Sequence, residues 1–222
     1  MVPLKKISAS LVAVFSFAFS FAQTKFSIAT DLGLQRSFKK EQQYWAVGHT
    51  VQAQFYFTPK DGAYAWISYY TNGKFTNHVS ATAKSIAISP QQINYDNNAV
   101  MRFKQISIGW KKYLKGAYNI EEGWSIYGYA GFGVILGRVE NTHSVSIDTV
   151  LYNVPVRVGM ANFKRLTLDL GLGWEVPLGA DIFLYAEGRA WIPTTDYPSK
   201  YILVNENAPL VGMINAGIRI LF

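Results

Sequence analysis

Residues 166–178 read LTLDLGLGWEVPL, and every even-numbered position in this stretch is apolar. The odd-numbered positions between them are threonine, aspartate, glycine, glycine, glutamate and proline. A strict period of two predicts a β-strand, because successive side chains leave opposite faces of a sheet. A water-soluble sandwich would bury the apolar face against another sheet, whereas a membrane barrel turns that face to lipid and keeps small and polar residues inside.

The composition and the amino-terminal segment indicate an exported protein. Only 16% of the 222 residues are charged, where about a quarter is usual for soluble domains. Residues 1–22 are predicted to be a signal peptide: two lysines precede a short apolar run, and the small residues Ser20 and Ala22 place cleavage before Gln23. An amino-terminal membrane anchor is the alternative, for which the run is short. Cleavage would lower the formal net charge from +7 to +5, because it removes two lysines.

Two classes of protein are excluded by what the sequence lacks. The chain has no cysteine, which rules out a disulfide framework and cysteine-ligated metal sites. After the leader, no segment approaches the ~20 apolar residues of a transmembrane helix. Residues 23–222 are therefore expected to form one exported domain without a helical anchor.

Eight extended segments are predicted in this domain. They are residues 25–36, 44–58, 63–71, 100–114, 124–138, a sixth that ends at 178, 182–192 and 210–222. The connections after the second, fourth and sixth segments are tight turns, and the others are longer and polar. With both termini on one side, all tight turns fall on that side. This layout predicts an all-β fold, an eight-stranded antiparallel transmembrane β-barrel with short periplasmic turns and longer extracellular loops.

The tryptophans fall at the ends of the predicted strands. Four are at the turn-side ends and two at the loop-side ends, in the order Trp66, Trp110, Trp124 and Trp174, then Trp45 and Trp191. Tryptophan favours the headgroup level of a bilayer, so this distribution predicts two aromatic girdles. The alternation puts Trp191 on the polar face, which would turn it inward. It does not decide which face of segment 63–71 is which.

Several motifs carry a resemblance to a known family. They are FAQ at 21–23, YGYAGFG at 127–133, YAEGR at 185–189 and GIRILF at 217–222. With these motifs the sequence resembles the small eight-stranded outer-membrane barrels of the OmpA/OmpX type, a group described broadly as outer membrane protein β-barrel domain. The resemblance implies a barrel in the bacterial outer membrane and no single activity. It also implies that Ile218, Ile220 and Phe222 form the signal read by the barrel-assembly machinery.

Charged residues on the predicted inner face point to a filled lumen. They are Asp169, Glu175, Glu187, Arg189 and Arg219. An eight-stranded barrel is only wide enough for its own side chains, and buried charges are tolerable only when they are paired. We therefore predict a structural network of salt bridges. The alternative is a gated path for protons or ions, which would make the protein a narrow channel.

Basic residues collect at the loop-side ends of the strands. The set that we assign to a rim at the lipid headgroups is Arg102, Lys104, Arg138, Lys164 and Arg165. Lysine and arginine suit phosphate, so outer-membrane lipids, including lipopolysaccharide, are the predicted partners of this rim. A merely solvated rim is the alternative. Nucleic acid is not expected, because no recognition module is visible.

The loops and the absence of a catalytic set complete the prediction. Residues 72–99 contain the stretch VSATAKSIAIS, which could extend strands beyond the membrane as a projecting edge, and 143–153 and 201–205 also have β-forming residues. Exposed edges could bind an extracellular partner, although the loops could equally be only protective. Of the three histidines, His49 alone lies where a base beside the barrel would be, and no serine stands at motif spacing. A non-enzymatic protein without cofactor or metal is expected. A lipid A-modifying enzyme and a soluble, exported lipocalin-like carrier remain alternatives.

Overall fold

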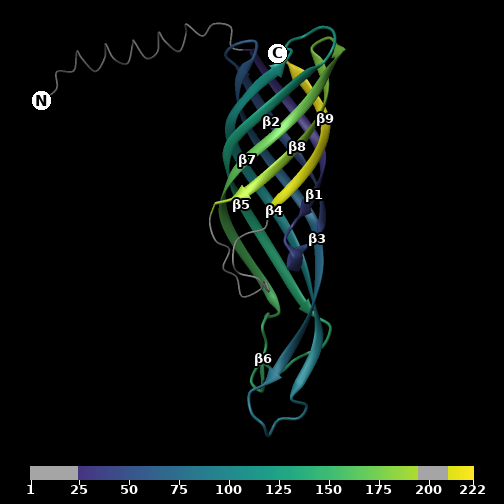
Figure 1. Cartoon of the computed structure of the whole chain (residues 1–222), viewed down its shortest axis with the longest axis vertical. Coiled ribbons are helices and arrows are strands. Elements are labelled where there is room, and N and C mark those ends of the chain that lie inside the picture. The colour runs from purple at the N-terminus through teal and green to yellow at the C-terminus, as the bar shows by residue number, and fades with distance from the viewer. Residues whose placement is uncertain (1–24, 195–209) are drawn as a thin grey trace, which may run out of the picture.

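The computed structural model describes residues 25–194 and 210–222 (Figure 1). The predicted signal peptide, residues 201–205 and most of the last long connection lie outside these residues. The elements are β1 (Lys25–Ser37), η1 (Lys40–Gln42), β2 (Trp45–Tyr56), β3 (Asp61–Ala83), β4 (Gln92–Lys115), β5 (Ser125–His143), β6 (Tyr152–Asn153), β7 (Gly159–Gly179), β8 (Ile182–Pro193) and β9 (Val211–Leu221).

Eight of the described strands form a closed antiparallel ring. Their order is β2-β1-β9-β8-β7-β5-β4-β3, and pairing of β2 with β3 closes the ring. Figure 1 shows these strands crossing the long axis of the molecule at a tilt, as barrel closure requires. The short strand β6 lies outside the ring and pairs with the end of β3. The predicted eight-stranded barrel is confirmed.

The two ends of the barrel differ. The turn end carries the connections 57–60, 116–124 and 180–181 together with the end of β9 (upper part of Figure 1). At the opposite end, which we call the loop end, β3, β4, β5 and β7 continue beyond the other strands, and β6 lies among their tips. The molecule therefore has a barrel body and a projecting β-structured extension.

The extension changes the predicted strand bounds on either side of connection 72–99 and agrees with the expectation that this connection extends the strands. In the structure β3 runs to Ala83 and β4 starts at Gln92, so only residues 84–91 connect them. A bulge at Asn72, which has a φ of 62°, shifts the register before pairing resumes. Beyond it, polar side chains pair across the two strands, for example Thr76 with Asn98 at 2.8 Å. The sequence of this segment resembles that of a loop, because a β-ribbon that lies beyond the barrel body needs no apolar outer face and so shows no alternation.

The strand that carries LTLDLGLGWEVPL, β7, shows the predicted two faces. Leu170 and Leu172 on the outer wall are 39% and 62% exposed, whereas Asp169 on the inner wall is fully buried. The inner glycines of this stretch face tyrosines: Gly171 pairs with Tyr129, and a Cβ at Gly171 would overlap the Tyr129 ring. Glycine is therefore required here for space inside the lumen.

Trp66 does not belong to an outer girdle, and this prediction was wrong. Its side chain is 2% exposed inside the lumen, where it stacks on Tyr64 at 4.4 Å and donates to Gln105 at 3.2 Å. Even-numbered residues of β3 therefore face inward up to the bulge. Glycines on the neighbouring strands make room for this inward layer of β3, because Cβ atoms at Gly109 and Gly131 would meet the Tyr64 hydroxyl. The other tryptophans follow the prediction: Trp45, Trp110, Trp124 and Trp174 are exposed outside, and Trp191 is buried.

Buried side chains fill the barrel in layers. One aromatic cluster, which includes Tyr56, Tyr113 and Tyr127, lies toward the turn end. A second, which includes Tyr44 and Trp191, lies toward the loop end. A third, small cluster of Ala81, Tyr95 and Tyr152 is the core of the extension. The buried charges lie in the barrel body with the first two clusters.

Candidate functional site

The first part of the lumen network is centred on Arg189 of β8. Its Nη2 lies 2.6 Å from Asp31 Oδ2 and 2.6 Å from Glu187 Oε2. All three side chains are at most 1% exposed. Asp31 also accepts hydrogen bonds from the Tyr185 hydroxyl at 2.9 Å and from Asn215 Nδ2 at 2.6 Å. One guanidinium therefore compensates two carboxylates that are themselves further hydrogen-bonded.

The second part of the network is centred on Glu175 of β7. Its Oε1 accepts from Arg219 Nη2 at 2.8 Å and from the Tyr113 hydroxyl at 2.9 Å. Lys111 Nζ lies 3.8 Å from Oε2 and donates to Gln54 at 3.0 Å. All of these groups are buried, so two cations hold the carboxylate away from the surface of the protein.

Asp169 is satisfied differently from the other predicted charges. It accepts from Gln105 Nε2 at 2.7 Å, from Thr167 Oγ1 at 2.9 Å and from the Ser107 hydroxyl. No basic group among the described residues lies within 4 Å of it. The expectation that every inner charge has an ionic partner therefore does not hold at Asp169.

Sequence reasoning missed two members of the network, Asp31 and Lys111. Both carry the parity of the inner face: Asp31 lies opposite the apolar positions of β1, and Lys111 continues the polar positions of β4. The alternation could therefore have found both. It could not have found their partners, because Arg189 and Asp31 are 158 residues apart in the chain.

Aromatic rings and the turn at 116–124 enclose this network. Lys111 Nζ lies 3.4 Å from the centre of the Tyr127 ring, a cation–π geometry. Tyr118 of the turn stacks on Tyr56 at 4.2 Å, and its carbonyl accepts from Arg219 at 2.7 Å. The turn thus packs against the end of the lumen that lies at the turn end, while the aromatic cluster with Tyr44 and Trp191 fills the loop end. This arrangement is suited to holding the barrel together.

A groove on the outer wall collects four of the five predicted rim residues. It has a volume of about 570 Å³, and we call it the basic groove. Its cations come from β4, β5 and β7, and they are Arg102, Lys104, Arg138 and Lys164. Lys104, Leu136 and Lys164 lie in one register row, and Arg102 pairs with Arg138 in the next row toward the loop end. The row on the other side is apolar, with Ile106, Val134 and Leu166.

The basic groove keeps an excess of positive charge. Glu140 alone among acidic residues pairs with these cations in the described chain, accepting from Arg138 Nε at 2.9 Å and lying 3.5 Å from Arg102 Nη1. Both arginine side chains remain about two-fifths exposed. Arg165 is not in this groove: it has the inner parity of Thr167, on the other face of β7.

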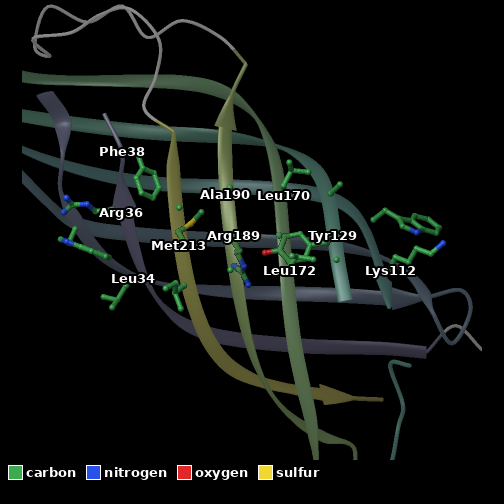
Figure 2. Close-up of a pocket in the computed structure, with 18 residues that line it drawn as sticks. Leu34, Arg36, Phe38, Lys112, Tyr129, Leu170, Leu172, Arg189, Ala190 and Met213 are labelled. Atoms are coloured by element: carbon green, nitrogen blue, oxygen red, sulfur yellow. The ribbon is translucent and has the colours of Figure 1, made fainter. Parts of the chain in front are cut away.

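A larger apolar groove of about 1070 Å³ crosses the outer wall (Figure 2). Small residues make up part of its lining, namely Gly128, Ala130, Gly188, Ala190 and Gly212. Leu170 and Leu172 project beside it from β7, and Leu34 and Phe38 lie on the β1 side. Arg36 and Lys112 contribute the charges at its margins. Such a surface suits contact with hydrocarbon.

Solved structures of known proteins share this architecture. Neisserial surface protein A matches with a TM-score of 0.54 at 11% identity, over 90% of this chain and all of that one. A major outer membrane protein of Thermus thermophilus matches with a TM-score of 0.53 at 11% identity over the same shares. Ail of Yersinia pestis, in complex with the heparin analogue sucrose octasulfate, matches with 0.51 at 12% identity, over 90% of this chain and 99% of that one. This chain has the fold of the small outer-membrane β-barrels. Neither a family model nor a curated protein matches the sequence.

The last strand of this outer-membrane-type barrel presents its terminal residues outward. Ile218 and Ile220 are 44% and 43% exposed on the wall near the turn end, and Phe222 is 64% exposed. The Phe222 amide donates to the Phe26 carbonyl at 2.7 Å, so the end of the chain is held at the seam between β9 and β1. These residues are accessible along the edge where β9 joins the ring.

The three histidines of the barrel lie apart. His49 is on the wall of β2 against Tyr69, His78 pairs with Asp96 at 2.6 Å on the extension, and His143 packs at a tilt on Tyr95 at the end of β5. The described residues contain no group of three or more histidine, cysteine, aspartate or glutamate side chains that could hold a metal ion. Within residues 25–194 and 210–222, no helix is long and apolar enough to cross a membrane.

Proposed function

We propose that this protein is an integral protein of the bacterial outer membrane, exported by the segment 1–22, whose role is binding and envelope integrity rather than catalysis. One observation carries the proposal: an outer wall of exposed leucine and isoleucine surrounds a lumen filled by paired charges and aromatic rings. A wall of this kind is stable in lipid and not in water. A filled lumen favours a structural or binding role over that of a channel.

The basic groove is the proposed contact with the phosphate groups of outer-leaflet lipids, including lipopolysaccharide. The row of the groove nearer the turn end, Lys104 and Lys164, directly follows the last apolar row of the wall, at the height where headgroups begin. Four cations face one carboxylate there, so an anionic lipid would complete the charge balance. Crystalline Ail, which has this fold, holds a sulfated sugar, and polyanion binding is compatible with such a barrel.

The extension is the proposed contact with an extracellular partner, and β9 with the barrel-assembly machinery. The extension has its own small core and paired polar ladder, so it presents a defined surface. The exposed Ile218, Ile220 and Phe222 at the seam are available to be recognised before the barrel closes. A non-enzymatic role is favoured by the separation of the histidines and by the lack, in the described part of the chain, of a nucleophile paired with His49.

The lipid contact is tested by comparing two charge-matched double variants purified from membranes. Lys104→Gln with Lys164→Gln removes the two lysines of the basic groove, and Lys25→Gln with Lys60→Gln removes the same amount of charge at the turn end. We expect the first variant to retain at least tenfold less lipopolysaccharide, measured by mass spectrometry of the bound lipid, because each charge-assisted phosphate contact contributes about 1.5–3 kcal/mol. Equal retention by both variants would contradict the assignment.

The location and the filled lumen are tested independently. The protein should fractionate with outer membranes and shift in gel mobility on heating. Planar bilayers that contain it should show no discrete conductance steps. Recovery from the soluble fraction would refute the membrane location, and regular conductance steps would refute the filled lumen.

A further inference from the structure

The segment between β5 and β7, residues 144–158, is held against the β3–β4 hairpin. Its strand β6 pairs with the end of β3 (lower part of Figure 1). Lys84 donates from Nζ to the Thr149 carbonyl at 2.7 Å, and the Tyr152 hydroxyl donates to the Pro90 carbonyl at 2.9 Å. These contacts come from the end of β3 and from the tip of the hairpin, residues 84–91. A long connection that is tied down in this way is preorganised, and such loops commonly carry function.

This segment encloses a pocket of about 500 Å³, which lies away from the basic groove and from the lumen network. Volumes in this range accept small molecules. Part of its lining is apolar, with Val145, Ile147, Val154 and Val158. The polar part consists of His143 and Arg157 together with the hydroxyls of Ser146 and Thr149. An apolar wall with a few convergent polar groups is the usual composition of a ligand site.

The polar groups of this pocket select an anion. Arg157 is exposed, and no carboxylate of the described residues lies within ion-pair distance of it. The one acidic residue in the segment, Asp148, is turned to its own backbone, where Oδ1 accepts from the Val150 amide at 2.8 Å. None of the described residues that line the pocket is acidic. A guanidinium in an apolar surround binds oxyanions strongly and in a fixed orientation.

His143 adds a second polar group with unused capacity. Its ring packs on Tyr95 at 4.5 Å between centres, and its buried Nε2 has no hydrogen-bond partner among the described residues. Burial lowers the pKa of this imidazole, and a hydrogen bond with the Val156 backbone opposes that shift in part. The ring nitrogens of a neutral imidazole donate or accept according to the tautomer. A buried polar atom without a partner costs free energy that a ligand can recover.

The apolar wall is exposed although it lies beyond the barrel body. Val145 and Val158 are 47% and 56% exposed. Apolar side chains that cluster around a hollow in an aqueous segment indicate an interaction site. A ligand that satisfies both halves of the pocket has an anionic head and an apolar body.

We propose that this pocket binds a small amphipathic anion, with its carboxylate or other oxyanion on Arg157 and His143 and its apolar body against Val145 and Val158. The probe is 4-(trifluoromethyl)benzoate, observed by fluorine NMR with the full chain in lipid nanodiscs and with empty nanodiscs subtracted. The neutral probe 4-(trifluoromethyl)benzamide has nearly the same shape and no charge. We expect saturable binding of the benzoate and at least tenfold weaker binding of the benzamide, in proportion to a lost charge-assisted hydrogen bond.

Three variants locate the binding. Arg157→Gln should weaken benzoate binding by about tenfold or more while leaving benzamide binding unchanged. Val158→Trp should block both probes by filling the pocket. Arg138→Gln, which removes the same charge from the basic groove, should change neither. All variants should retain heat-modifiable gel mobility, because each altered side chain is at the surface of the barrel or its extension.

Any of three results would overturn the proposal. These are no saturable benzoate binding by the unaltered protein, equal affinity for the two probes, or equal loss of affinity in the Arg157 and Arg138 variants. The last result would assign the binding to surface charge in general. Failure of lipopolysaccharide retention at the basic groove leaves these outcomes unaffected, because the two sites share no residue.

Discussion

Arg189→Met tests whether the lumen network stabilises the barrel through charge compensation. Arg189 lies between Asp31 and Glu187 at 2.6 Å from each, with all three side chains at most 1% exposed. Methionine fills a similar volume without a charge. The substitution therefore leaves two buried carboxylates without their shared cation and changes little else in the packing.

The expected cost follows from the remaining contacts. Breaking a buried ion pair from one side costs about 3–5 kcal/mol, because an uncompensated charge stays behind. Asp31 retains the Tyr185 hydroxyl and Asn215, and Glu187 retains the Tyr127 hydroxyl at 2.6 Å, so the loss should stay within this range. A triple variant with Asp31→Asn, Glu187→Gln and Arg189→Met removes all three charges. The free energy of unfolding of this triple variant should exceed that of Arg189→Met alone by at least about 2 kcal/mol, because no uncompensated charge remains.

Equilibrium urea unfolding in phospholipid vesicles, followed by tryptophan fluorescence, measures both variants against the unaltered chain. Heat-modifiable mobility gives a second readout of the folded fraction. The interpretation is refuted if Arg189→Met lowers the free energy of unfolding by less than about 1 kcal/mol, well below the range for a buried pair. It is also refuted if the triple variant is as unstable as the single one, because volume rather than charge would then decide the stability.

Three further predictions concern separate features. Gly171→Ala should cost about 1–3 kcal/mol in the same assay, because its Cβ would overlap the Tyr129 ring, whereas Gly188→Ala faces open space on the wall and should be neutral. The lowered pKa of His143 means that the docked segment 144–158 loses stability as pH falls below about 6.5, since the unfolded state then binds the extra proton. The amide protection factors of this segment, corrected for the intrinsic exchange rate at each pH, should therefore fall between pH 7.5 and pH 5, and His143→Phe should abolish that change. Phe222→Ala should lower assembly into outer membranes in cells and leave refolding into detergent unchanged, and equal defects in both would contradict a recognition role.

The sequence by itself determined the eight-stranded barrel and, except in β3, the two faces of its strands. The alternation in 166–178 placed leucines outward and Asp169 and Glu175 inward, because a period of two leaves no other arrangement in a strand. The same alternation, applied to β1 and β4, also places Asp31 and Lys111 on the inner face. It did not determine the length of β3 and β4, since polar ribbons beyond the lipid lack the apolar face that signals a strand.

Only the tertiary structure decided which inward residues meet. Parity assigns a face but not a height or a partner across the lumen, so the pairing of Arg189 with Asp31, 158 residues away, depends on the register of every intervening strand. Trp66 lies inside because glycines on neighbouring strands leave room for its layer, and glycine alone does not reveal what fills that room. Likewise, Arg157 and His143 line one pocket because β6 pins their connection to β3. That contact is between distant segments, and local sequence pattern does not encode it.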